Sequence, residues 1–288
     1  MRTLLLFLFT TLLFGQSKET DKHLILPALV SDNMVLQQSS SVGVWGWAEK
    51  NKEVMISADW NSETLTVKTD ASGKWKTKIK TPVAGGPFSI KISTNKEQIT
   101  LNNVLIGEVW MGSGQSNMEM PMAGYNNQPI NDSNELILSS KNQQIRLFTV
   151  KRKTSKTPLY DCEGSWQEAS PETVADFSAV AYNFAKQLNN TLGVPIGIIN
   201  SSWGGTPVEA WIQLEAVEDE VTLEEQKLFN YNISENKREQ DAPAYLFNGM
   251  INPILDFSLK GVIWYQGESN RNQPRLYSKT FPLMIQNS

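Results

Sequence analysis

Hydrophobic and polar residues alternate in short runs over the first third of the chain. Stretches such as VGVWGWAE (residues 42–49) and EVMISADW (residues 53–60) alternate with a period of two, and charged or Gly-containing turns separate them. This pattern is typical of strands with one buried face. The sequence DASG at residues 70–73 predicts a hairpin turn. No useful length shows a helical period, so we expect a small antiparallel β-sandwich over residues 24–103.

After about residue 104 the pattern changes to longer apolar runs. VLIGEVWM (104–111), VPIGIINS (194–201) and KGVIWY (260–265) are nearly continuous apolar segments, as expected of strands that are buried on both faces. Between them, apolar residues recur at three- and four-residue spacings over 172–192, which predicts one long helix. Strands that alternate with helices indicate a parallel, doubly wound α/β sheet over residues 104–288.

Local signals refine the connections in this second region. Ser170-Pro171 provides a start for the long helix, and Gly193 provides its end. The charged segment 215–241 is expected to be helical and exposed. Residues 119–135, rich in Met, Asn and Pro, are expected to form a surface loop that borders a substrate site.

The first residues, MRTLLLFLFTTLLFGQS, have the layout of a secretory signal peptide over residues 1–17. The apolar run is too short to span a bilayer, and no Cys follows it as an acceptor for a lipid anchor. We therefore expect export to the periplasm, the cell envelope or the medium, with no membrane span after cleavage. An uncleaved membrane anchor is the alternative.

Composition narrows the classes of partner. The formal net charge of -4 gives no basic surface for nucleic acid. The chain has nine Trp, which fit a packed core better than sugar platforms, and we assign Trp203 and Trp264 to the core. Cys162 is the single cysteine, so no internal disulfide forms, and we interpret it as structural.

Each of the three apolar strands ends in a small, polar, Gly-containing loop. The loops read GSGQSN (112–117), NSSWGGT (200–206) and QGESN (266–270). Because parallel strands place their carboxyl ends at one edge of a sheet, the three loops are expected to share a site.

Acyl transfer suits these residue types. Ser116 offers a nucleophilic hydroxyl, the backbone near Gly205 can approach an oxyanion closely, and the amide of Gln266 or Asn270 can donate as well. Gly-x-Ser alone is a weak signal, because glycine and serine are common in loops, and the second Gly of the G-x-S-x-G elbow is absent. We interpret Glu268 as a hydrogen-bonding group that holds its loop.

Five longer motifs sharpen this interpretation. The segments GEVWMGSGQSNMEMPM, FSAVAYNFAKQL, GVPIGIINSSWGGTPVEAWI, FNGMINPI and KGVIWYQGESN together resemble the sialate O-acetylesterases of the SGNH hydrolase superfamily, over about residues 24–277 and in the family's order. The resemblance implies a flavodoxin-like three-layer α/β/α domain after a β-rich jelly-roll domain. It also implies an acetylated sugar as the substrate, with no metal and no organic cofactor.

Carried over to this sequence, the resemblance makes Ser116 the nucleophile and Gly205 an oxyanion donor. Gln266 takes the second oxyanion role, with Asn270 as the weaker candidate. The family's base is a His in an Asp-x-x-His block far downstream of QGESN, and no such block is present here. His23, the one histidine, lies beside the signal peptide and is interpreted as an ordinary solvated residue.

The missing base leaves three interpretations open. The chain is expected to be the N-terminal fragment, C-terminally incomplete, of an exported carbohydrate O-acetylesterase. The alternatives are a catalytically inactive or sugar-binding protein, and an esterase for other acetylated polymers such as xylan. The sequence does not separate these substrates, and it does not indicate the oligomeric state.

Overall fold

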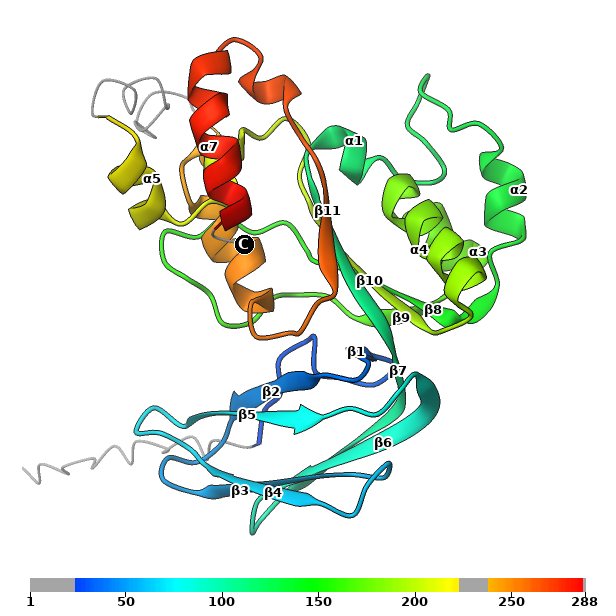
Figure 1. The fold of residues 1–288 in the computed structure, drawn as a ribbon, viewed down its shortest axis with the longest axis vertical. Coiled ribbons are helices and arrows are strands. Elements are labelled where there is room, and N and C mark those ends of the chain that lie inside the picture. Colours follow the sequence, from blue (N-terminus) through cyan, green and yellow to red (C-terminus); the bar gives the residue numbers. More distant parts are fainter. Residues whose placement is uncertain (1–23, 223–237, 287–288) are drawn as a thin grey trace, which may run out of the picture.

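The computed structural model describes residues 24–222 and 238–286. A β-rich part at the amino-terminal end lies below a larger part in which helices flank a sheet (Figure 1). The expected signal peptide and His23 lie outside the described residues. Within the described residues, no helix is both long enough and apolar enough to cross a membrane.

The β-rich part contains two groups of paired strands. β2 (Ser41–Trp47) pairs antiparallel with β5 (Lys74–Lys80). The other group has the order β4 (Thr64–Lys68), β3 (Glu53–Ala58), β6 (Gly85–Ser93) and β7 (Gln98–Gly114), and the short β1 (Val35–Gln37) pairs parallel with β7. Buried side chains of both groups, such as Val44 and Ile56, join one hydrophobic cluster. The alternation thus predicted the antiparallel strands correctly, whereas a jelly-roll domain is not confirmed.

The hairpin predicted at residues 70–73 is wrong in one respect. A turn forms there, since the Gly73 N–H donates to the Asp70 carbonyl at 3.1 Å. However, the strands on either side do not pair with each other, because β4 pairs with β3 and β5 pairs with β2. The turn therefore carries the chain from one group of strands to the other.

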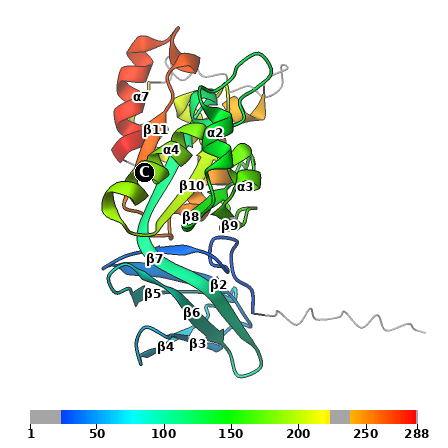
Figure 2. The ribbon, with the colours of Figure 1, turned by 90° about the vertical axis from the view of Figure 1, so that its right-hand side faces the viewer.

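β7 joins the two parts of the molecule. Its first half pairs antiparallel with β6, and its second half pairs parallel with β10 (Ile196–Ser202) and β11 (Gly261–Tyr265). Figure 2 shows this strand running from the lower part into the upper one. The expected boundary between residues 103 and 104 falls inside this strand, and the division into two domains stays a prediction.

The upper sheet has the mainly parallel arrangement that the sequence predicted. Its order is β11, β7, β10, β8 (Asn142–Thr149) and β9 (Trp166–Ala169), with only β9 antiparallel to its neighbour. Helix α4 (Ala179–Leu192) packs on one face. The π-helical turn η3 (Phe247–Ile251) contributes to the cluster on the other face, on the same side as α7 (Pro274–Gln286) in Figure 1. The chain is thus a mixed α/β protein with a large central sheet.

The single helix predicted over 172–192 is wrong, because the structure has two helices. α3 (Pro171–Ala175) is followed by a break and then by α4. Ser178 causes the second start: its Oγ accepts from the Ala181 N–H at 3.1 Å and donates to the Met118 carbonyl at 2.5 Å. The predicted outer ends are confirmed, since Ser170 caps α3 and Gly193 ends α4 in the left-handed conformation.

The remaining helices are short. α1 (Ser116–Glu119) and α2 (Ser133–Leu138) flank the segment predicted as a surface loop, so α2 takes over its last residues. The helix predicted over 215–241 is seen as α5 (Leu214–Glu220) and the turn η2 (Glu239–Asp241), with residues 223–237 outside the description. Turns η1 (Val208–Trp211), η4 (Asn252–Ile254) and η5 (Glu268–Asn270) complete the set.

Candidate active site

The three strand-end loops meet at one edge of the sheet, as predicted. Ser202 of β10 and Tyr265 of β11 are both in register with Gly114 of β7, so the three strands end level with one another. The loops at 112–117, 200–206 and 266–270 therefore leave the sheet side by side. A shared site built from three separated sequence segments follows directly from the parallel pairing.

A sharp turn presents Ser116 at this edge. Gly114 has φ +134, and a Cβ there would lie 2.2 Å from the Tyr265 carbonyl oxygen, so only glycine fits without a backbone shift. The Gln115 N–H then donates to the same carbonyl at 3.0 Å, and Ser116 begins α1. Among the described residues, the Ser116 hydroxyl has no hydrogen-bond partner. The hydroxyl is thus unengaged at the mouth of the three loops.

Gln115 fastens the first loop to the third. Its side chain is 3% exposed, and its Oε1 accepts from the N–H groups of Gly267 and Ser269, both at 3.2 Å. Its Nε2 donates to Glu268 Oε2 at 3.3 Å, which confirms Glu268 as a residue that holds the loop. Gln115 was not among the residues predicted for the site. Its position next to Ser116 was the available signal.

Glu119 fastens the first loop to the second. Its Oε2 accepts from the Gly204 N–H at 2.8 Å, while Oε1 accepts from Nε and Nη2 of Arg152. The Arg152 guanidinium also lies 5.4 Å from the ring centre of Trp203. Neither charged residue was predicted to have a role, because their partners lie far away in the sequence and only folding brings them together.

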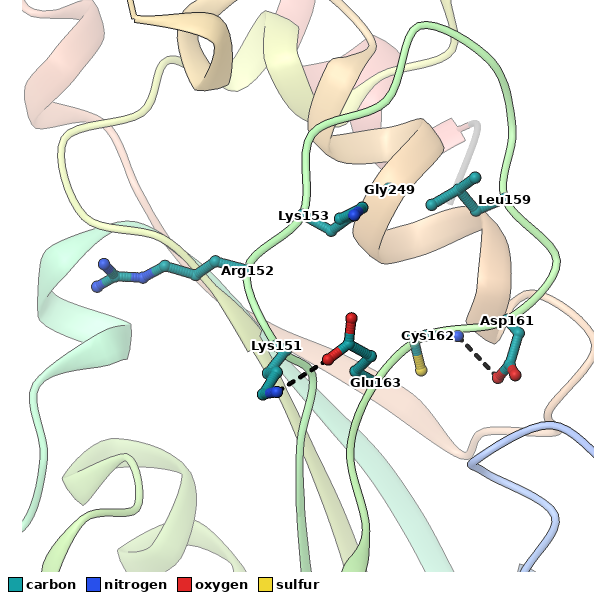
Figure 3. A pocket seen from close by; sticks show the side chains of 8 residues that line it. All are labelled: Lys151, Arg152, Lys153, Leu159, Asp161, Cys162, Glu163 and Gly249. Atoms are coloured by element: carbon teal, nitrogen blue, oxygen red, sulfur yellow. Dashed lines mark hydrogen bonds and ion pairs between the residues drawn. The ribbon is translucent and has the colours of Figure 1, made fainter.

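A small hollow is lined in part by the segment that follows β8, which includes Arg152. It has a volume of about 240 Å³ and is lined by Lys151, Arg152, Lys153, Leu159, Asp161, Cys162, Glu163 and Gly249. Figure 3 shows the Arg152 side chain directed away from the other lining side chains, whereas Lys151 pairs with Glu163 of the neighbouring segment at 2.8 Å. Arg152 thus lines the hollow, while its guanidinium contacts Glu119 and Trp203 beside the strand-end loops.

The glycine pair of the second loop lies against the serine. A Cβ on Gly204 would lie 3.4 Å from the Ser116 Cβ and 2.8 Å from Glu119 Oε2, so a side chain at this position would crowd both residues. Gly205 has φ +73, and its carbonyl accepts from Arg238 Nη2 at 2.6 Å. Its N–H has no acceptor among the described residues. That free donor fits the oxyanion role expected for Gly205, which stays a prediction.

The two side-chain amides expected as oxyanion donors are engaged in internal hydrogen bonds. Gln266 Nε2 donates to the Thr206 carbonyl at 3.1 Å and to Asn270 Oδ1 at 2.7 Å. Asn270 is 2% exposed, and its Nδ2 donates to both carboxyl oxygens of Glu209. The amide hydrogens of Gln266 are thus in use in this state, and the amino group of Asn270 faces a buried carboxyl. Their oxyanion roles stay predictions.

Three further assignments can be compared with the structure. Trp203 and Trp264 are partly buried and pack against the main hydrophobic cluster, which agrees with the core interpretation. Burial raises the pKa of the Cys162 thiol to about 12, and the nearby Asp161 carboxylate adds to this shift. A thiol with so high a pKa is a poor nucleophile, in keeping with a structural cysteine.

The described residues include no histidine, since His23 lies outside them. They also hold no group of three or more His, Cys, Asp or Glu side chains that is arranged to bind a metal ion. The serine therefore has no histidine base beside it in the part of the chain that the structure describes.

Comparison with known proteins places the chain in a family. A family model described as carbohydrate esterase, sialic acid-specific acetylesterase, matches residues 106–288. The sialate O-acetylesterases of Rattus norvegicus and Homo sapiens are each 32% identical to the chain, which aligns over 89% of its own length and over 54% and 51% of theirs. The chain thus spans about half the length of these curated relatives.

A solved structure supports the same relationship. A carbohydrate acetylesterase from Xanthomonas citri superimposes with a TM-score of 0.80 at 35% identity, over 92% of this chain and 56% of that protein. The family model begins within β7 and includes all three strand-end loops. The chain belongs to the carbohydrate esterase family of sialic acid-specific acetylesterases.

Proposed function

We propose that the protein is an esterase that removes O-acetyl groups from sialic acid or a related acetylated sugar, with Ser116 as the nucleophile. The observation that carries the proposal is the unengaged Ser116 hydroxyl at the meeting point of three loops, directly beside the Gly204–Gly205 backbone. Family membership and the names of the relatives supply the substrate class. A flavodoxin-like SGNH fold is part of the proposal, and export with a signal peptide at residues 1–17 accompanies it.

The reaction has two steps. Ser116 Oγ attacks the acetyl carbonyl carbon, its proton passes to a base, and the sugar oxygen leaves with a proton, which gives the acetyl-enzyme. Water then attacks the same carbonyl, releases acetate and returns the proton to Ser116. The negative oxygen that forms in each step lies near the Gly205 N–H, the free backbone donor.

The base is the part of this mechanism that the described residues do not contain. A serine hydroxyl is a weak nucleophile without one. We expect the base to be the histidine of the Asp-x-x-His block that the resemblance implies. The Arg152–Glu119 pair is no substitute, because the carboxylate already accepts from Arg152 and Gly204.

Acetate release by the complete protein tests the proposal. Substrates are O-acetylated sialic acid and acetylated xylan fragments, and the variant is Ser116→Ala. Ser165→Ala is the matched control, because Ser165 is an exposed serine in the loop before β9. Loss of activity in Ser116→Ala alone supports the proposal. Equal activity in Ser116→Ala and the wild type refutes the serine mechanism, and sugar binding without acetate release favours a binding protein.

A further inference from the structure

A carboxyl group with no ion-pair partner is buried behind the third loop. Glu209, in turn η1, is 2% exposed. Both of its oxygens accept from Asn270 Nδ2, Oε1 at 3.0 Å and Oε2 at 2.9 Å, and Oε1 also accepts from Thr280 Oγ1 at 3.0 Å. No salt bridge among the described residues includes Glu209. Its hydrogen bonds connect the second loop region, the third loop and α7.

Burying a carboxyl group without an ion-pair partner costs free energy of folding. Burial raises the pKa of Glu209, while the hydrogen bonds from Asn270 and Thr280 act in the opposite direction. Tyr277 of α7 is a titratable group that interacts with it, since the Glu209 charge is one cause that raises the pKa of this phenol, after burial. An apolar residue would be cheaper in a core that only had to be filled. The carboxyl therefore calls for an explanation other than packing.

The hydrogen bonds that start at Glu209 have a fixed direction. A carboxylate only accepts, so Asn270 must turn its amino group toward Glu209 and its Oδ1 the other way. That oxygen accepts from the Val208 N–H at 2.9 Å and from Gln266 Nε2 at 2.7 Å. Glu209 thereby decides which end of the Asn270 amide faces Gln266.

The same constraint is passed on to Gln266. Because Asn270 presents an oxygen, Gln266 must present its amino group, which also donates to the Thr206 carbonyl at 3.1 Å. Gln266 Oε1 is left buried without a partner among the described residues. The next residue, Gly267, is hydrogen-bonded to Gln115, the neighbour of Ser116. The chain of contacts thus ends beside the nucleophile.

We propose that Glu209 is a positioning residue for the esterase reaction: through Asn270 it fixes the orientation of Gln266 and the third loop next to Ser116. This inference rests on the proposed function. It assigns Asn270 to the support of the loop rather than to the oxyanion.

Glu209→Gln is the first test, in the complete protein. Glutamine keeps the size but turns an amino group toward the amino group of Asn270, so the fixed direction is lost. We expect kcat to fall by about 10-fold to 100-fold, less than the roughly 100-fold to 1000-fold loss on removing an oxyanion donor, with KM little changed. Glu215→Gln is the matched control, because Glu215 is an exposed carboxyl of α5 and its loss should leave kcat unchanged.

A reciprocal exchange provides the rescue. Asn270→Asp alone places two carboxyl groups face to face, so kcat should fall and its pH profile should shift. In the double variant Glu209→Gln with Asn270→Asp, the amino group at 209 donates to the carboxylate at 270. That carboxylate still accepts from Val208 and Gln266, so the direction of the contacts is restored. We expect the double variant to regain most of the kcat lost in either single variant.

The outcomes separate this inference from the proposed function. If the wild type shows no Ser116-dependent acetate release, the proposed function fails. If it does and Glu209→Gln retains full kcat, the positioning role alone fails. A purely structural role predicts a lower Tm with unchanged kcat per folded molecule, and it also overturns the inference. Should Glu209→Gln not fold, the double variant decides: a folded but inactive double variant overturns the inference, and an active one supports it.

Discussion

Replacement of Gln115 by Ala is the most direct perturbation of the junction between the first and third loops. The side chain is buried and makes three contacts across this junction, two as an acceptor from backbone N–H groups at 3.2 Å and one as a donor to Glu268. Alanine removes all of them. The change leaves the Ser116 side chain itself intact.

The expected magnitude follows from these contacts. Each neutral hydrogen bond contributes about 1 kcal/mol net, and an N–H left unpaired in a buried place costs about 1–3 kcal/mol. The two backbone donors of Gly267 and Ser269 are partly buried, so we expect the free energy of unfolding to fall by about 2–4 kcal/mol. For a chain of 288 residues that corresponds to a fall in Tm of roughly 3–7 °C.

Thermal unfolding and initial rates of acetate release measure both consequences. Because the third loop loses its connection to the loop of Ser116, kcat should fall by at least about 10-fold at a temperature where the variant is folded. Gln187→Ala is the control, since Gln187 is exposed on α4 and contacts only Thr191 through its side chain. If Gln115→Ala unfolds at the same temperature as the wild type and keeps its kcat, the anchoring role deduced for Gln115 is wrong.

Three other predictions follow from single contacts. Cys162, with its pKa raised to about 12, should react with iodoacetamide at pH 8 only after denaturation, and rapid alkylation of the native protein would contradict its burial. Arg152→Ala should change the free energy of unfolding by less than about 1 kcal/mol, because the guanidinium is half exposed and its pair with Glu119 is screened, and chemical denaturation measures this. Burial raises the pKa of Glu209 in the folded state, so folding favours its protonated form. This contribution to stability is complete at pH values below the ordinary pKa of 4.5, and it is lost as the pH rises through the higher pKa of the folded state. Glu209→Gln should therefore flatten the fall in Tm above pH 4.5, and parallel Tm profiles of the two proteins would refute this.

The sequence predicted the elements whose signals are local. Nearly continuous apolar runs identified β10 and β11, and parallel pairing then required their loops to lie beside Ser116. The prediction of one helix over 172–192 was wrong, because apolar residues at three- and four-residue spacings are expected both for one long helix and for two consecutive helices. The break depends on Ser178, whose hydroxyl bonds to Met118, 60 residues away in the sequence.

What the sequence determined by itself is the family, the class of fold and the residue types at the three strand ends. These follow from periodicity and from motifs that can be read along the chain. Tertiary structure alone decided how the loops are held. Gln115 reaches Ser269, Glu119 reaches Gly204, and Glu209 sets the direction of Asn270. Hydrogen bonds between residues so far apart depend on the distance and direction of donor and acceptor in space, and no spacing along the chain encodes either.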